Sequence, residues 1–255
     1  MPRGRLSKAV ALCCALALLL ASSAAGGGAL VKVDDIVLRA DGSFQPRSLP
    51  RRQFAPIDFQ GHFDIAATGS GKPVALEAAV VDFDHDGRLD PGGLPVCPPE
   101  RIANASSAEA RRVCAGAMVG SGHIRALIGL PGGPVPVSSL LSIFNGPRQA
   151  GNPTVILHAQ ITVPATQTLA IVVPIERRRG EFRYRATLDL PPIAGGLGAV
   201  THVDVDVGRR FSVGGQRRSY VSARCSDGIL RTHGRFSFAD GTIIDGNVEK
   251  ACQPR

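Results

Sequence analysis

Apolar and polar residues alternate along much of this chain, which is the pattern of strands that pack one face and expose the other. The strictest case is the segment 200–207. One of its faces carries Val203, Val205 and Val207, and the other carries His202, Asp204 and Asp206. We therefore predict a strand here with one buried and one wet face.

Turn residues between such segments predict hairpins. Segments 169–176 and 181–190 flank a basic turn that ends in Gly180, and 235–239 and 242–248 flank Asp240-Gly241. A third hairpin is predicted for 57–67 and 74–84.

The loop of that third hairpin is 68–72. Before it, 35–39 is expected to be a short strand that turns at Asp41-Gly42.

The segment 94–122 contains the one convincing helix signal after the N-terminal region. Ser106 and Glu109 have the spacing of a capping box, in which each side chain accepts a backbone N–H of the other residue. Good helix formers follow, and Gly116 is placed to end the run. We expect two to three turns of helix, which are too short to be stable alone.

Four cysteines follow the N-terminal region: Cys97, Cys114, Cys225 and Cys252. An even number in an exported chain predicts two disulfides. Of the three possible pairings we favour 97–114 with 225–252, since each pair brackets a compact unit. A zinc site is the rival interpretation, although no C-x-x-C spacing is present.

Many short strands punctuated by Gly, Pro and Asp-Gly predict a mostly β fold, an antiparallel β-sandwich or open barrel with one short disulfide-bracketed helix. We divide the chain into a signal peptide (1–25), an N-terminal lead and connector (26–53), and a β-rich domain (54–252) that contains the helix module 94–122.

The first residues have the features of a secretory signal. Arg3, Arg5 and Lys8 precede an apolar run over 9–20, and the small residues 23–25 suit a signal peptidase. The run is short for a membrane span, and no later segment has spanning length. We predict a secreted protein or one on the extracellular face of the envelope. An uncleaved signal that anchors the chain is the alternative.

The charge balance bears on partners. The whole chain has a formal charge of +8, which becomes +5 without the three basic signal residues. This excess permits weak attraction to acidic envelope polymers, and it is too dispersed for a specific nucleic-acid surface.

One acidic stretch resembles a calcium loop. Asp82, Asp84 and Asp86 occupy loop positions 1, 3 and 5, Gly87 position 6 and Asp90 position 9. Position 12, where such loops place a bidentate acid, is a glycine. A structural calcium ion is therefore one hypothesis, and an acidic turn after a strand is the other. No further cofactor is expected.

No catalytic residue is assigned. The six histidines are not at metal-ligand spacing, and Ser121 lacks the full nucleophile-elbow motif. An extracellular hydrolase with residues scattered in sequence stays open as an alternative.

The blocks 94–97, 110–122, 193–198 and 219–225 resemble those of an uncharacterised family of exported proteins from high-GC Gram-positive bacteria. The resemblance covers about 54–252 and implies no activity, substrate or catalytic residue. Taken together, these features predict an exported, non-catalytic binding or structural component of the cell envelope or extracellular space.

Overall fold

The computed structural model describes residues 27–255, and most of them lie in strands. The predicted signal peptide falls outside this range. Twelve strands form the main sheet. In chain order they are β1 (Ala29–Val33), β2 (Ile36–Gln45), β5 (Asp58–Ala67), β6 (Leu76–Asp84), β8 (Met118–Leu130), β9 (Gly133–Gln149), β10 (Asn152–Ile161), β11 (Gln167–Arg177), β12 (Phe182–Asp189), β13 (Gly198–Val207), β17 (Ile229–Phe238) and β18 (Ile243–Ala251).

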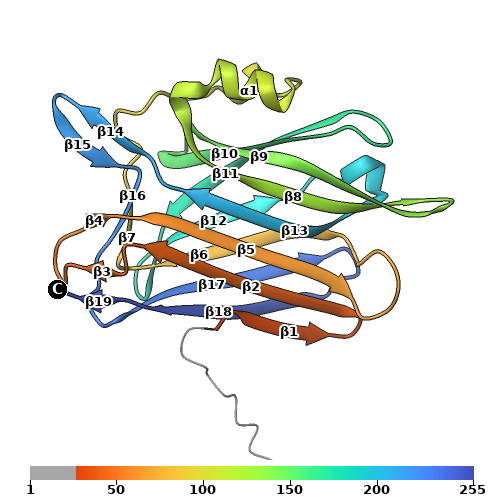
Figure 1. Cartoon of the computed structure of the whole chain (residues 1–255), viewed down its shortest axis with the longest axis horizontal. Coiled ribbons are helices and arrows are strands. Elements are labelled where there is room, and N and C mark those ends of the chain that lie inside the picture. The colour runs from red at the N-terminus through yellow and green to blue at the C-terminus, as the bar shows by residue number, and fades with distance from the viewer. Residues whose placement is uncertain (1–26) are drawn as a thin grey trace, which may run out of the picture.

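The main sheet curls into a nearly closed antiparallel barrel (Figure 1). Its strand order is β1-β2-β5-β13-β8-β9-β10-β11-β12-β6-β17-β18, and every neighbouring pair is antiparallel. Strands β8, β9 and β13 lie on one side of the interior, and β1, β17 and β18 lie on the other. The predicted class, mostly β with an antiparallel barrel and one short helix, is confirmed.

Short strands stand outside the main sheet. They are β3 (Ser48–Leu49), β4 (Ala55–Pro56), β7 (Gly87–Leu89), β14 (Arg210–Val213), β15 (Gln216–Ser219), β16 (Val221–Ala223) and β19 (Gln253–Pro254). They form the groups β4-β16-β7, β14-β15 and β19-β3. Tyr220, which joins β15 to β16, packs against the interior residues Val119 and Ile143 of β8 and β9.

The helix module covers the outside of the barrel. Its helix α1 (Ser107–Val113) begins as predicted, because the Ser106 hydroxyl accepts the N–H of Glu109 at 3.2 Å. The 3₁₀ turns η1 (Pro99–Arg101) and η2 (Ala115–Ala117) flank it. Figure 1 shows α1 over β9 and β10, where the module packs on Phe144 and Ile156.

Both disulfides form in the favoured pairing. Cys97 joins Cys114, and Cys225 joins Cys252. The first bridge ties the helix module together beneath α1. The second ties the segment between β16 and β17 to the residue that follows β18, and it packs on Phe44 and Leu49.

Two predicted turns are wrong. Strands β5 and β6 do not pair with each other: β5 lies between β2 and β13, and β6 lies between β12 and β17. The loop 68–72 therefore connects two parts of the barrel instead of closing a hairpin. Asp41-Gly42 makes no turn either, since β2 runs through it from Ile36 to Gln45. Alternation identifies strands correctly here, but it does not say which strands pair.

The other two predicted hairpins are confirmed. Strands β11 and β12 pair across the basic turn, and β17 pairs with β18 across Asp240-Gly241. Within residues 27–255, no helix has the length and apolar character needed to cross a membrane.

Candidate ligand-binding cavity

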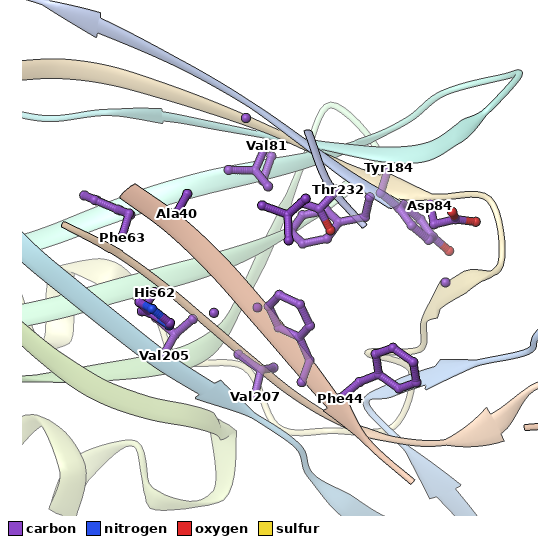
Figure 2. A pocket seen from close by; sticks show the side chains of 18 of the residues that line it. Ala40, Phe44, His62, Phe63, Val81, Asp84, Tyr184, Val205, Val207 and Thr232 are labelled. Carbon is purple, nitrogen blue, oxygen red and sulfur yellow. The ribbon is translucent and has the colours of Figure 1, made fainter. Parts of the chain in front are cut away.

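The barrel encloses a cavity of about 400 Å³, which is the main candidate for a functional site. Its wall is made almost entirely of apolar side chains that point inward from strands on all sides. Figure 2 shows Phe63, Val81, Val205 and Val207 around this space. Other lining residues include Phe59, Phe83, Leu141, Ile143, Val155, Leu157, Val173, Ile175, Ala186 and Leu188.

The strand pattern explains why the wall is apolar. In β13, Val203, Val205 and Val207 lie on the inward face, as their alternation with polar residues predicted, and there they line the cavity. All three are only half-buried, because they face open space instead of a packed core. Protein interiors rarely leave voids larger than a water molecule, so a space of this size sets this interior apart from an ordinary core.

The opposite face of the same strands carries a polar network. His202 lies between two acids, with Nδ1 2.7 Å from Asp64 Oδ1 and Nε2 3.2 Å from Asp204 Oδ2. His123 Nδ1 lies 3.3 Å from the other oxygen of Asp204. These contacts join β5, β13 and β8 on the outside of the barrel and do not reach the cavity.

Two hydroxyls give one part of the cavity a polar edge. Tyr184 on β12 and Thr232 on β17 are the cross-strand neighbours of Phe83 on β6, and both line the cavity (Figure 2). The Tyr184 oxygen accepts the N–H of Leu89 at 3.4 Å, so its own O–H remains a donor. A ligand here would meet a hydrocarbon wall with a small number of hydrogen-bonding groups, which is the usual make-up of small-molecule sites.

The two most buried cationic side chains that line the cavity, Lys250 and Arg231, both form ion pairs. Lys250 Nζ lies 2.6 Å from Asp41 Oδ1, and Arg231 Nη1 lies 2.7 Å from Asp227 Oδ2. Burial alone would raise the pKa of Asp41, but hydrogen bonds from Lys250 and from the Gly42 N–H hold it below its ordinary value. These two cations therefore offer a ligand little unopposed charge.

Two acids of the predicted calcium loop, Asp82 and Asp90, lie apart from the other two. Asp82 forms a bidentate pair with Arg185, both contacts being 2.8 Å, and the hydrogen bond from this guanidinium lowers the Asp82 pKa. Asp90 accepts the Gly92 N–H at 3.3 Å and lies 3.9 Å from Arg218.

The structure brings Asp84 and Asp86 together with His85, whose Nδ1 and Nε2 lie 3.1 and 3.4 Å from the two carboxylates. Burial raises the pKa of Asp84, although the N–H groups of Asp86 and Arg231 oppose this.

Asp86 has protein donors on both oxygens. Arg224 Nε lies 2.5 Å from Oδ1, and the Ser226 N–H donates to Oδ2 at 2.7 Å. Burial raises the Asp86 pKa, but these two partners more than offset that effect and lower it overall. A calcium ion would have to compete with a guanidinium for this oxygen, so the contacts favour the acidic-turn interpretation. Calcium binding stays a prediction.

The cavity residues were not identified from the sequence. The alternation in β13 and the spacing of Phe59 and Phe63 in β5 show an inward apolar face, but the same pattern would fit a tightly packed sandwich. The space between the walls depends on how the twelve strands are joined, and no local motif encodes that.

Comparisons with known proteins give no match. No protein-family model matches the chain, and neither a curated protein nor a solved structure is significantly similar to it. The resemblance to an exported family of high-GC Gram-positive bacteria therefore stays a prediction.

Proposed function

We propose that this chain is an exported, non-catalytic binding protein that holds an uncharged, largely apolar molecule inside its barrel. The observation that carries the proposal is the apolar cavity of about 400 Å³ inside the barrel. Sites for small molecules typically enclose about 300–1,000 Å³, so the cavity is large enough for one such ligand.

The physical reason for binding is the unfilled space. The half-buried side chains around it lack partner atoms on one side, and a ligand would restore those contacts. Each methylene group transferred from water into the cavity contributes about 0.8 kcal/mol. The hydroxyls of Tyr184 and Thr232 would accept one polar group of the ligand without requiring it to be charged.

Export is the second part of the proposal. The signal-like sequence at 1–25 supports it, and the two disulfides are typical of proteins that fold in an oxidising compartment. Acidic envelope polymers are proposed as weak, non-specific partners because of the excess of basic residues. The hydrolase and the signal-anchored protein stay as alternatives that no observation here favours.

The test uses the oxidised protein without residues 1–25 and the neutral fluorescent probe N-phenyl-1-naphthylamine, which brightens in apolar surroundings. We expect saturable brightening with the native chain. Val205→Phe, which fills the cavity, should weaken probe binding at least ten-fold. The matched control is Val96→Phe, which adds the same ring at an exposed position outside the barrel and should bind like the native protein.

Native mass spectrometry of protein purified from its own host adds a direct readout. A co-purifying small molecule that is lost in Val205→Phe and kept in Val96→Phe would support the proposal. Absence of probe binding by the native chain, or equal binding by both variants, would contradict it.

A further inference from the structure

The barrel is not closed by hydrogen bonds all the way round. The sheet ends at β1 on one side and at β18 on the other, and no backbone ladder joins them in residues 27–255. Strand β1 pairs only with residues 36–40 of β2, so 41–45 of β2 have no strand hydrogen-bonded on that side. We call this break, between β18 and the β1-β2 pair, the seam.

The cavity extends to the seam from both sides. Ala29 and Val31 of β1 line it, and so do Gly246 and Val248 of β18. A Cβ atom placed on Gly246 would lie 3.8 Å from the Ala29 Cβ and 3.8 Å from Val31 Cγ2. Small residues, Ala29 and Gly246, therefore face each other at this point of the seam.

An ion pair crosses the seam next to these small residues. Lys250 lies on the same inward side of β18 as Ile244, Gly246 and Val248, and its side chain is 13% exposed. Its ammonium contacts Asp41 of β2 at 2.6 Å. An inward lysine on a terminal strand also discourages edge-to-edge aggregation. Protection against aggregation would not require Lys250 to form an ion pair with Asp41 on the other side of the seam.

Buried side chains pack toward each end of the barrel. Tyr220, 1% exposed, packs with Leu94, Val119 and Ile143 at one end. Ile193 of the 3₁₀ turn η3 (Ile193–Gly196) is buried with the residues of β8, β10 and β13 near the other.

The outer face of the seam carries exposed apolar side chains. Leu30 on β1 is 61% exposed, and Ile243 on β18 is 48% exposed. An apolar molecule that approaches from outside would find a partly apolar surface beside the break in the hydrogen-bond ring.

We propose that the ligand enters and leaves sideways through the seam, and that the Lys250–Asp41 ion pair is the latch that holds the seam shut. This inference rests on the proposed function, since it concerns the route to the same cavity. Separating β1 from β18 breaks no backbone ladder, whereas opening any other strand pair breaks a row of hydrogen bonds. The wall can thus part at the seam without loss of a backbone ladder, and the cost is the apolar contact of Val31 and Val33 with the buried cluster that contains Ile244.

The decisive experiment locks the seam covalently. In the double variant Ala29→Cys with Gly246→Cys, the two Cβ atoms would be 3.8 Å apart, which is the usual separation in a disulfide. Uptake of N-phenyl-1-naphthylamine is timed by stopped-flow fluorescence. We expect the cross-linked variant to take up and release the probe at least ten-fold more slowly than the native chain.

The matched control is the same double variant with its two new thiols alkylated before they can pair, which should exchange the probe faster than the cross-linked form. Mass spectrometry confirms the new bridge and both native ones. If the cross-linked variant exchanges the probe at the native rate, entry through the seam is refuted, while the proposal that the cavity binds a ligand is unaffected. Failure of the native chain to bind the probe at all would instead refute the proposed function.

A second variant tests the latch without a cross-link. Asp41→Asn removes the acid from the ion pair, and we expect several-fold faster probe uptake and release. Asp189→Asn, an exposed strand acid with no ion pair among the described residues, is the control and should leave both rates unchanged. Equal rates in Asp41→Asn and the native chain would rule out the latch.

Discussion

Asp86 shows how this protein holds a buried charge. Its side chain is 0% exposed, and its two oxygens accept hydrogen bonds from the guanidinium of Arg224 and the backbone of Ser226. These contacts connect the turn after β6 to the segment that follows β16. The acid thus acts as a structural cross-link between two distant parts of the sequence.

We expect Asp86→Asn to lower the free energy of unfolding by about 2–3 kcal/mol, because the amide nitrogen would face a donor and Arg224 would lose its counter-charge. Urea denaturation measures the loss. Asp189→Asn, at an exposed strand position, is the control and should change stability by less than about 0.5 kcal/mol. If Asp86→Asn lowers the free energy of unfolding no more than the control does, the contacts of Asp86 with Arg224 and Ser226 do not stabilise the fold.

The pH dependence of that loss follows from the direction of the pKa shift. The folded-state pKa of Asp86 is below its ordinary value of 3.8, so its stabilisation is complete above that pH and is lost as the pH falls through the folded-state pKa. The stability difference between the native chain and Asp86→Asn should therefore shrink below about pH 3.8. A difference that stays constant down to pH 2 would contradict this assignment.

His158 is a second residue whose environment sets its charge. It lies beneath the helix module, with Nε2 3.2 Å from the carbonyl oxygen of Ala105 and no acid against its ring in the described residues. Burial lowers its pKa below the ordinary 6.5. The folded state therefore disfavours the protonated ring, which the unfolded chain accepts freely below that pH.

We predict that His158 makes the protein less stable as the pH falls below about 6.5, since the unfolded state then binds the additional proton. His158→Gln, which keeps a donor near Ala105, should lose less stability than the native chain between pH 7.5 and 5.5. Thermal denaturation at both pH values measures this. His123→Gln, at an exposed position, is the control. Identical pH slopes for His158→Gln and the native chain would refute the prediction.

At the scale of elements, the helix module depends on its bridge and its packing. Helix α1 has seven residues, too few for stability in water without support. The Ser106 N-cap gives it a start, while the Glu109 carboxylate binds Arg112 instead of completing the capping box. The Cys97–Cys114 bridge and the contacts with Phe144 and Ile156 hold it on β9 and β10.

Replacing both Cys97 and Cys114 by serine should lower the free energy of unfolding by about 3 kcal/mol, the value that the chain-entropy model gives for a loop of this length. Hydrogen exchange should increase first in α1 and in the facing parts of β9 and β10. Arg112→Ala breaks only a surface ion pair with Glu109, so it should change stability by less than about 0.5 kcal/mol. Uniform exchange across the barrel would argue against local release of the module.

The strands illustrate what local patterns can predict. Short turns bring their flanking strands together directly, and this is why the hairpins β11-β12 and β17-β18 were predicted correctly. The longer loop after β5 leaves its flanking strands free to pair elsewhere. The contacts of Asp82 and Asp86 could not be predicted from local patterns either, because their partners Arg185 and Arg224 lie more than a hundred residues away in the sequence.

For the whole molecule, basic residues outnumber acidic ones, and three of them, Arg88, Arg183 and Arg224, lie 5.8, 5.2 and 5.3 Å from the centroid of the Phe54 ring. We expect the mature protein to sediment with purified cell walls at low salt and to be released by about 0.5 M salt, where the Debye length is only a few ångströms. Retention that survives high salt would show a specific wall ligand. No retention at either salt concentration would contradict the proposed attraction to acidic polymers.

The sequence by itself determined the strand content, the short hairpins, the capped helix and the four cysteines of the two bridges, since each depends on residues close in the chain or on the chemistry of one residue type. Only the tertiary structure decided that β5 and β6 lie in separate parts of the ring, that the walls stand apart around a cavity, and that the ring stays open between β1 and β18. Those features arise from pairings between residues far apart in sequence, which alternating polarity permits in many combinations and does not choose among.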